Sequence, residues 1–241
     1  SEGAYAAVSI SEALSKGLGV QIIKAFPGGG PYRMGSAAVL RAIEAMDKGS
    51  FPKNRRYYAV LVGNSYSSTN PNVPNYGKGQ DALGVRRDEL VKLAVESTMT
   101  RGINAHVPED DPLSVLRTEF LSWAREAIKK EDRDPCVNDL RDGFNDMMCK
   151  ALKENDLTET LHKADYPVQL CHSPEDEVVH IDNLPDLSKN PNLSYAESAG
   201  THVSAAHVCY VYPLAFLGSP EFKAYKVPND ALEACSVTAT Q

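Results

Sequence analysis

A helical pattern that changes into a strand pattern within three residues constrains this chain most. Residues 4–16 are rich in Ala and contain no Pro or Gly, and Gly17 and Gly19 end the helix that they predict. Residues 20–26 follow at once and are short and rich in β-branched side chains, which is typical of a strand. A helix joined so closely to a strand is half of an α/β unit, so the sequence predicts a layered α/β fold with a parallel sheet.

The same alternation returns in the last third of the chain. Residues 167–171 and 193–196 predict two further parallel strands, and residues 204–217 predict the helix that follows them. The expected organisation therefore has four parts: a first helix and strand, a helical insertion, an α/β core and a tail, at residues 1–35, 36–165, 166–218 and 219–241.

The insertion carries amphipathic helical patterns over residues 37–46 and 87–100. Two more helices are expected to begin after Asp111-Pro112 and Asp134-Pro135, because each pair puts a capping residue before a proline. Their apolar stripes, which include Trp123, have the spacing of helices that pack on a core rather than of a cofactor site.

Composition excludes several classes of protein. The net charge of −7 argues against a general nucleic-acid binder, which needs a basic surface. No apolar run is long enough to span a bilayer, so we expect no transmembrane segment. The five cysteines are widely spaced and form neither a disulfide framework nor a CxxC pair, and Cys171 is expected to be a small buried side chain.

Polar groups follow two of the predicted strands at the point where each strand ends. Asp176 lies in the turn after residues 167–171, and His202 follows Gly200 after residues 193–196. The carboxyl ends of parallel strands meet at one edge of a sheet, so this carboxylate and imidazole can become neighbours. A simpler interpretation is that Asp176 ends a turn and His202 begins a helix. A metal site built from His172, His180 and Asp176 is disfavoured, because their spacing matches no helical zinc motif.

These two segments resemble the C-terminal part of an α/β-hydrolase. In that family the acid follows the seventh strand in a D-x-V-V-like turn, here Asp176 to Val179, and the histidine follows the eighth strand in a G-x-H turn, here Gly200 to His202. The family nucleophile lies in a G-x-S-x-G turn from strand to helix. Ser1-Glu2-Gly3 is similar to its S-x-G part.

The resemblance implies specific roles. Ser1 would be the nucleophile, Asp176 and His202 would complete the triad, and the backbone N–H of Glu2 would be an oxyanion donor. The chain would then begin at its own catalytic serine and be the C-terminal half of a longer hydrolase, inactive by itself. Position 33 is Arg and no GK[ST] follows, so Gly28-Gly29-Gly30 is expected to be a loop into the insertion rather than a phosphate site.

The expected function is a serine hydrolase that cleaves small-molecule or lipid carboxylic esters through an acyl-enzyme, with no metal or organic cofactor. Residues 36–165 would form a lid over the serine and would supply any contact with a lipid interface, although an ordinary helical subdomain fits the pattern equally well. The alternative function is a non-catalytic hydrolase-like scaffold for binding.

Overall fold

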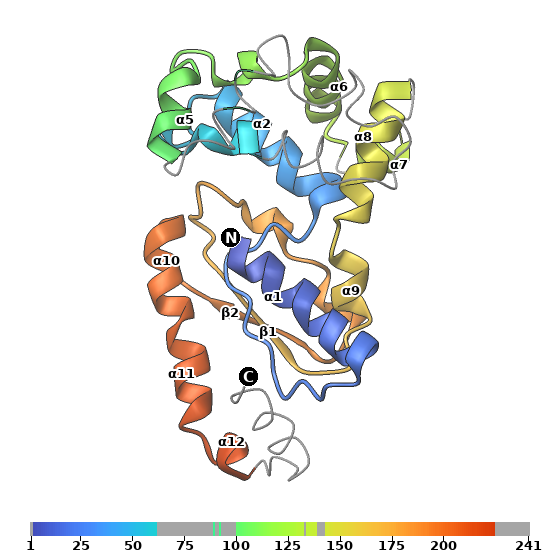
Figure 1. The fold of residues 1–241 in the computed structure, drawn as a ribbon, viewed down its shortest axis with the longest axis vertical. Helices are drawn as coiled ribbons and strands as arrows, with labels where there is room; N and C mark the ends of the chain where they lie inside the picture. The colour runs from blue at the N-terminus through green and yellow to red at the C-terminus, as the bar shows by residue number, and fades with distance from the viewer. Residues whose placement is uncertain are drawn as a thin grey trace, which may run out of the picture.

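The protein is described from a computed structural model, which describes residues 2–61, 89, 92, 100–132, 134–138 and 143–224. It is a mixed α/β protein in which a small parallel sheet with its covering helices lies beside a helical block, defined here as the described residues between 34 and 154 (Figure 1). The described part of the chain holds no helix that is both long and apolar enough to cross a membrane.

The sheet is built around a short strand near the end of the sequence. Strands β1 (Val168–His172) and β2 (Leu193–Glu197) run parallel, with Val168 opposite Leu193 and His172 opposite Glu197. Both strands lie within one residue of the ranges predicted for them. The parallel strands and the crossover between them confirm the α/β class at this coarse level.

The other edge of β1 is paired with residues 25–29. The N–H of Ala25 donates to Pro167 O at 2.9 Å, Cys171 N–H donates to Pro27 O at 3.0 Å, and Gly29 N–H donates to Cys171 O at 2.8 Å. The expected strand at residues 20–26 was therefore placed too early, since its pairing starts only at Ala25 and continues into the glycine run. Pro27 has no N–H to donate, which interrupts the ladder and leaves two isolated bridges rather than a regular strand.

Successive side chains of β1 point to opposite faces, and each face has its own helices. Val168 and Leu170 pack against α1 (Glu2–Glu12) and α9 (Thr158–His162) in one buried cluster. On the opposite face Cys171 contacts α10 (His202–Cys209), which α11 (Val211–Leu217) and α12 (Pro220–Ala224) follow down one side of the molecule (Figure 1). Burying a side chain such as Leu170 stabilises the fold by about 2 kcal/mol.

The helical block has a separate core, which includes Trp123 and Leu152. Its core packing confirms the interpretation of the Trp123 stripe. Its described helices are η2 (Met34–Ala38), α2 (Val39–Asp47), η3 (Lys53–Arg55), α5 (Thr100–His106), η4 (Pro112–Val115), α6 (Thr118–Lys129), α7 (Pro135–Asn138) and α8 (Gly143–Glu154).

Some helix boundaries differ from the sequence prediction. The first helix continues as predicted into η1 (Ala13–Gly17) and ends by Gly19. Asp134-Pro135 begins α7 as expected, but Asp111-Pro112 begins only the single turn η4. Leu116 and Arg117 are extended, so the long helix α6 starts at Thr118. The predicted helix at 87–100 lies almost wholly outside the described residues.

The prediction for the cysteines was wrong. Cys171 is buried as expected, but it forms a disulfide with Cys209, and Cys136 forms a second disulfide with Cys149. The first bridge joins β1 to α10, and the second joins α7 to α8. Each disulfide therefore fastens together two elements of one part of the fold.

Candidate active site

The turn after β1 is shaped around the carboxylate of Asp176. Its Oδ1 accepts hydrogen bonds from the N–H groups of Val178 at 2.9 Å and Val179 at 2.8 Å. Such an Asx-type turn is a common use of Asp, because the short side chain can reach the backbone two residues ahead. Asp176 is only 5% exposed, so the turn holds a buried carboxylate at the carboxyl end of the central strand.

His202 meets this carboxylate from the neighbouring strand connection. It is the first residue of α10, after Gly200 turns the chain with a φ of 89°. The Nδ1 atom of His202 lies 2.7 Å from Asp176 Oδ2, and the imidazole side chain is 11% exposed. The two residues that the sequence singled out are thus brought together by adjacent parallel strands.

The protonation state of the pair follows from its surroundings. Burial alone would raise the pKa of Asp176, but the hydrogen bond from His202 and the N–H groups of Val179 and Val178 outweigh it and hold that pKa below its ordinary value. Asp176 is therefore a carboxylate at neutral pH, and Nδ1 of His202 carries the proton between them. With Nδ1 bound to the acid, Nε2 is the ring nitrogen that can accept a proton, which is the arrangement of a general base.

A second histidine supports the same turn from inside. His172, the last residue of β1, is fully buried, and its Nε2–H donates to Val179 O at 2.7 Å. Burial lowers the pKa of His172 despite this hydrogen bond and the nearby carboxylate, so the ring is neutral. Because its Nε2 lies 3.7 Å from Asp176 Oδ2, His172 packs beside the acid without replacing His202 as its partner.

The glycine run forms a wall of the site. Gly29 has a φ of 61°, and a Cβ atom built there would lie 3.5 Å from His202 Cε1 and 3.6 Å from Asp176 Oδ2. A methyl group at residue 29 would therefore be in van der Waals contact with the acid–histidine pair. This loop also leads into the helical block, as the sequence predicted.

The remaining predicted site residues are less fully placed. Glu2 is exposed and is the first residue of α1. This end of α1 faces the helical block (Figure 1). Ser1 lies outside the described residues. The described residues include no cluster of three His, Cys, Asp or Glu side chains suited to a metal ion, and the Nδ1 atom of His180 accepts a bond from the N–H of Asp182.

Sequence reasoning missed Glu177 and Gly29 as parts of this site. Glu177 Oε2 accepts a hydrogen bond from the backbone N–H of His202 at 2.9 Å. A signal for it was its position directly after Asp176 in the same turn. For Gly29 the signal was a glycine run that immediately follows a predicted strand and so reaches the same sheet edge.

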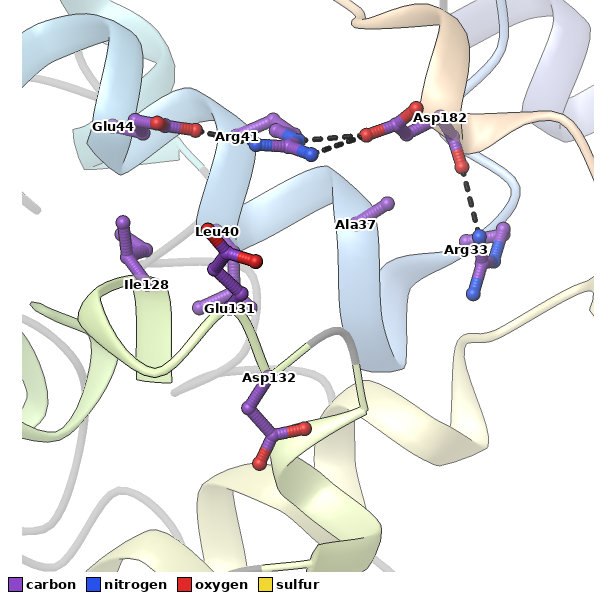
Figure 2. Close-up of a pocket in the computed structure, with 9 residues that line it drawn as sticks. All are labelled: Arg33, Ala37, Leu40, Arg41, Glu44, Ile128, Glu131, Asp132 and Asp182. Carbon is purple, nitrogen blue, oxygen red and sulfur yellow. Dashed lines mark hydrogen bonds and ion pairs between the residues drawn. The ribbon is translucent and has the colours of Figure 1, made fainter. Parts of the chain in front are cut away.

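A pocket of about 300 Å³ lies between the helical block and Asp182 of η5 (Ile181–Asn183), in the connection between β1 and β2 (Figure 2). Arg41 lines it and donates from Nη1 to Glu44 at 2.6 Å and from Nε to Asp182 at 2.8 Å. Arg33 donates to the backbone oxygen of Asp182 at 3.1 Å. The two guanidinium groups in the lining already bind protein oxygens. Four carboxylates also line the pocket, those of Glu44, Glu131, Asp132 and Asp182. Such a charged lining does not suit an acyl chain.

No protein-family model matches the chain, and no curated protein matches it.

Proposed function

We propose that this protein is a serine hydrolase of the α/β-hydrolase type that cleaves carboxylic esters of small molecules or lipids. In this proposal Ser1 is the nucleophile, His202 is the general base and Asp176 orients the imidazole. The N–H of Glu2 is one of the donors that stabilise the oxyanion, since it lies at the positive end of the dipole of α1.

One observation carries the proposal. The 2.7 Å contact between His202 Nδ1 and a buried, ionised Asp176 is the acid–base half of a triad, and it lies at the carboxyl edge of a parallel sheet. Nucleophilic catalysis needs a histidine held in this tautomer, and open parallel sheets form their sites at this edge. The chain order of serine, then acid, then histidine also matches the order in α/β-hydrolases.

The proposed reaction has two halves. His202 removes the proton from the serine Oγ while this oxygen attacks the ester carbonyl, and the tetrahedral intermediate collapses to an acyl-enzyme. The departing alkoxide takes the proton from His202 and leaves as the alcohol. Water then attacks the acyl-enzyme with His202 again as the base, and the carboxylic acid is released.

The helical block is proposed to be the lid over this site. Val178, two residues after the acid, packs against the core of the block, and Arg41 of α2 binds Asp182 farther along the same turn region. Because these contacts join the block to the segment that follows the acid, they support a role for the block as a lid.

The proposal is tested on the full-length natural protein with a fluorophosphonate probe, which reacts with activated serines. The wild type should be labelled and should hydrolyse a p-nitrophenyl ester. Ser1→Ala should abolish labelling, and Asp176→Asn should lower kcat on the order of 10³–10⁴-fold through loss of the correct histidine tautomer.

A matched control lies on the same helix as the proposed base. His207 is exposed on α10, five residues after His202, so His207→Ala should leave labelling and turnover unchanged. Labelling that survives both Ser1→Ala and His202→Ala would show that this site does not activate a serine. The non-catalytic scaffold would then be the better interpretation.

A further inference from the structure

The first turn of α10 is capped from an unusual place. Thr201 occupies the position before the helix, where a Thr side chain normally accepts a bond from an N–H of the first turn, but its hydroxyl pairs with Ser204 Oγ at 3.1 Å instead. The N–H of His202 is bound by the Glu177 carboxylate at 2.9 Å. This cap is supplied by a turn that lies 25 residues earlier in the chain.

The same turn therefore holds His202 at two points. Glu177 binds its backbone N–H and Asp176, the preceding residue, binds its ring. Two attachments from adjacent residues fix both the start of the helix and the direction of the imidazole. A carboxylate at a helix N-terminus is also favourable because it faces the positive end of the helix dipole.

Two neighbouring contacts also join these turns, but at Gly200 rather than at the histidine. Ser173 Oγ donates to Gly200 O at 2.6 Å, and Glu175 Oε2 accepts a hydrogen bond from Gly200 N–H at 3.2 Å. Glu177 is thus the one carboxylate of the acidic turn 175–177 that binds the histidine backbone.

We propose that Glu177 is a positioning residue for the general base, an inference that rests on the proposed function of His202. Its hydrogen bond to the His202 N–H sets the imidazole at the angle that the Asp176 contact requires. Glu177 itself touches no reacting atom, so its removal acts through the histidine.

The test compares Glu177→Ala with Glu177→Gln in the full-length protein. NMR follows hydrogen exchange of the His202 amide and the low-field proton of the Asp176–His202 hydrogen bond, and ester hydrolysis gives kcat and KM. In Glu177→Ala the amide should exchange about tenfold faster, the low-field proton should broaden or vanish, and kcat should fall about tenfold with little change in KM. Glu177→Gln keeps an acceptor oxygen at the same reach and should restore most of each signal.

Glu175→Ala is the matched control, since it removes a neighbouring carboxylate that binds Gly200 rather than the histidine. It should leave the low-field proton in place. Wild-type NMR signals in Glu177→Ala, or equal loss in the Gln and Ala variants, would overturn the inference. The NMR signals do not require turnover. Absence of ester hydrolysis would therefore refute the proposed function, while the NMR signals would still decide the role of Glu177.

Discussion

Cys171 on β1 and Cys209 at the end of α10 are joined by a disulfide, which fastens the helix that carries His202 to the sheet. The bridge lies seven residues from His202 along the helix, and close packing surrounds it, since a Cβ at Gly28 would lie 3.1 Å from Cys209 Cβ. The position of the histidine therefore depends on a covalent link as well as on hydrogen bonds.

Removal of this bridge should both destabilise the protein and disturb the site. For bridged cysteines 38 residues apart, the chain-entropy relation gives a loss of about 4 kcal/mol in the free energy of unfolding for the double variant Cys171→Ala/Cys209→Ala. The control Cys136→Ala/Cys149→Ala, with a separation of 13, should lose about 3 kcal/mol without a change in the His202 resonances. Urea denaturation and NMR measure the two effects, and equal disturbance of His202 by both double variants would contradict this prediction.

The Asp176 carboxylate should make stability depend on pH in the acid range. Its pKa in the folded protein lies below the ordinary 3.8, because hydrogen bonds from His202 and two backbone N–H groups outweigh burial. Its stabilisation is therefore fully present above the unfolded pKa and is lost as the pH falls through the lower folded pKa. Asp176→Asn should flatten the acid limb of the unfolding free energy plotted against pH.

Asp186→Asn supplies the comparison for that titration. Asp186 is an exposed carboxylate that accepts a hydrogen bond from Ser188 N–H, and solvent screens its interactions. Its acid limb should stay close to that of the wild type. An unchanged acid limb in Asp176→Asn would mean that the carboxylate contributes nothing to folding in this range.

Two glycines with similar positive φ values allow the effect of backbone strain to be distinguished from that of side-chain contact. Gly29 and Gly19 have φ values of 61° and 66°, so alanine at either position should cost about 1 kcal/mol in stability. A Cβ at residue 19 meets no atom within 4 Å, whereas one at residue 29 touches His202. Gly29→Ala, but not Gly19→Ala, should therefore shift the low-field proton of the Asp176–His202 bond and slow ester hydrolysis. Identical behaviour of both variants in every measurement would show that Gly29 does not form a wall of the site.

The ion pair between Arg41 and Asp182 should stabilise the contact between the helical block and the sheet. Its side chains are 31% and 23% exposed, and two guanidinium nitrogens bind one carboxylate oxygen. Arg41→Ala should lower the free energy of unfolding by about 1 kcal/mol.

Arg125 makes a similar two-point contact with Asp47, but within the block and with greater exposure, at 49% and 35%. Arg125→Ala should therefore cost about 0.5 kcal/mol or less. It should also leave hydrogen exchange in the turn containing Asp182 unchanged, whereas Arg41→Ala should speed it. The reverse order of effects would show that the contact between the two parts does not depend on Arg41.

The meeting of Asp176 with His202 could be predicted from sequence, because it depends on local patterns and on the geometry of parallel strands. Each residue follows a short apolar segment, and neighbouring parallel strands bring such positions to one edge. The Glu177 cap could not be predicted in the same way. It depends on the distance between two turns, while Thr201, the local candidate for the cap, bonds elsewhere.

Two other differences have tertiary causes. Residues 20–24 have strand-like composition, but β1 offers its edge only to residues 25–29, so pairing rather than propensity sets the boundary. Asp111-Pro112 is a good helix start, yet Leu113 and Val115 are buried in different clusters of the block, and the chain straightens at Leu116 after one turn. The pairing of Cys171 with Cys209 likewise needs the packing of α10 on β1, which cysteine spacing does not contain.

Val178 connects the turn after β1 both to Asp176 and to the helical block. Its amide holds the acid, while its side chain is part of the packing in the helical block. The acid–base pair and the block therefore cannot be exchanged as independent modules. A chimera that grafts this block onto another sheet should therefore include residues 176–179. Substitutions in the block core that repack Val178 should also change the hydrogen bonding of the Asp176 carboxylate, although they do not contact it.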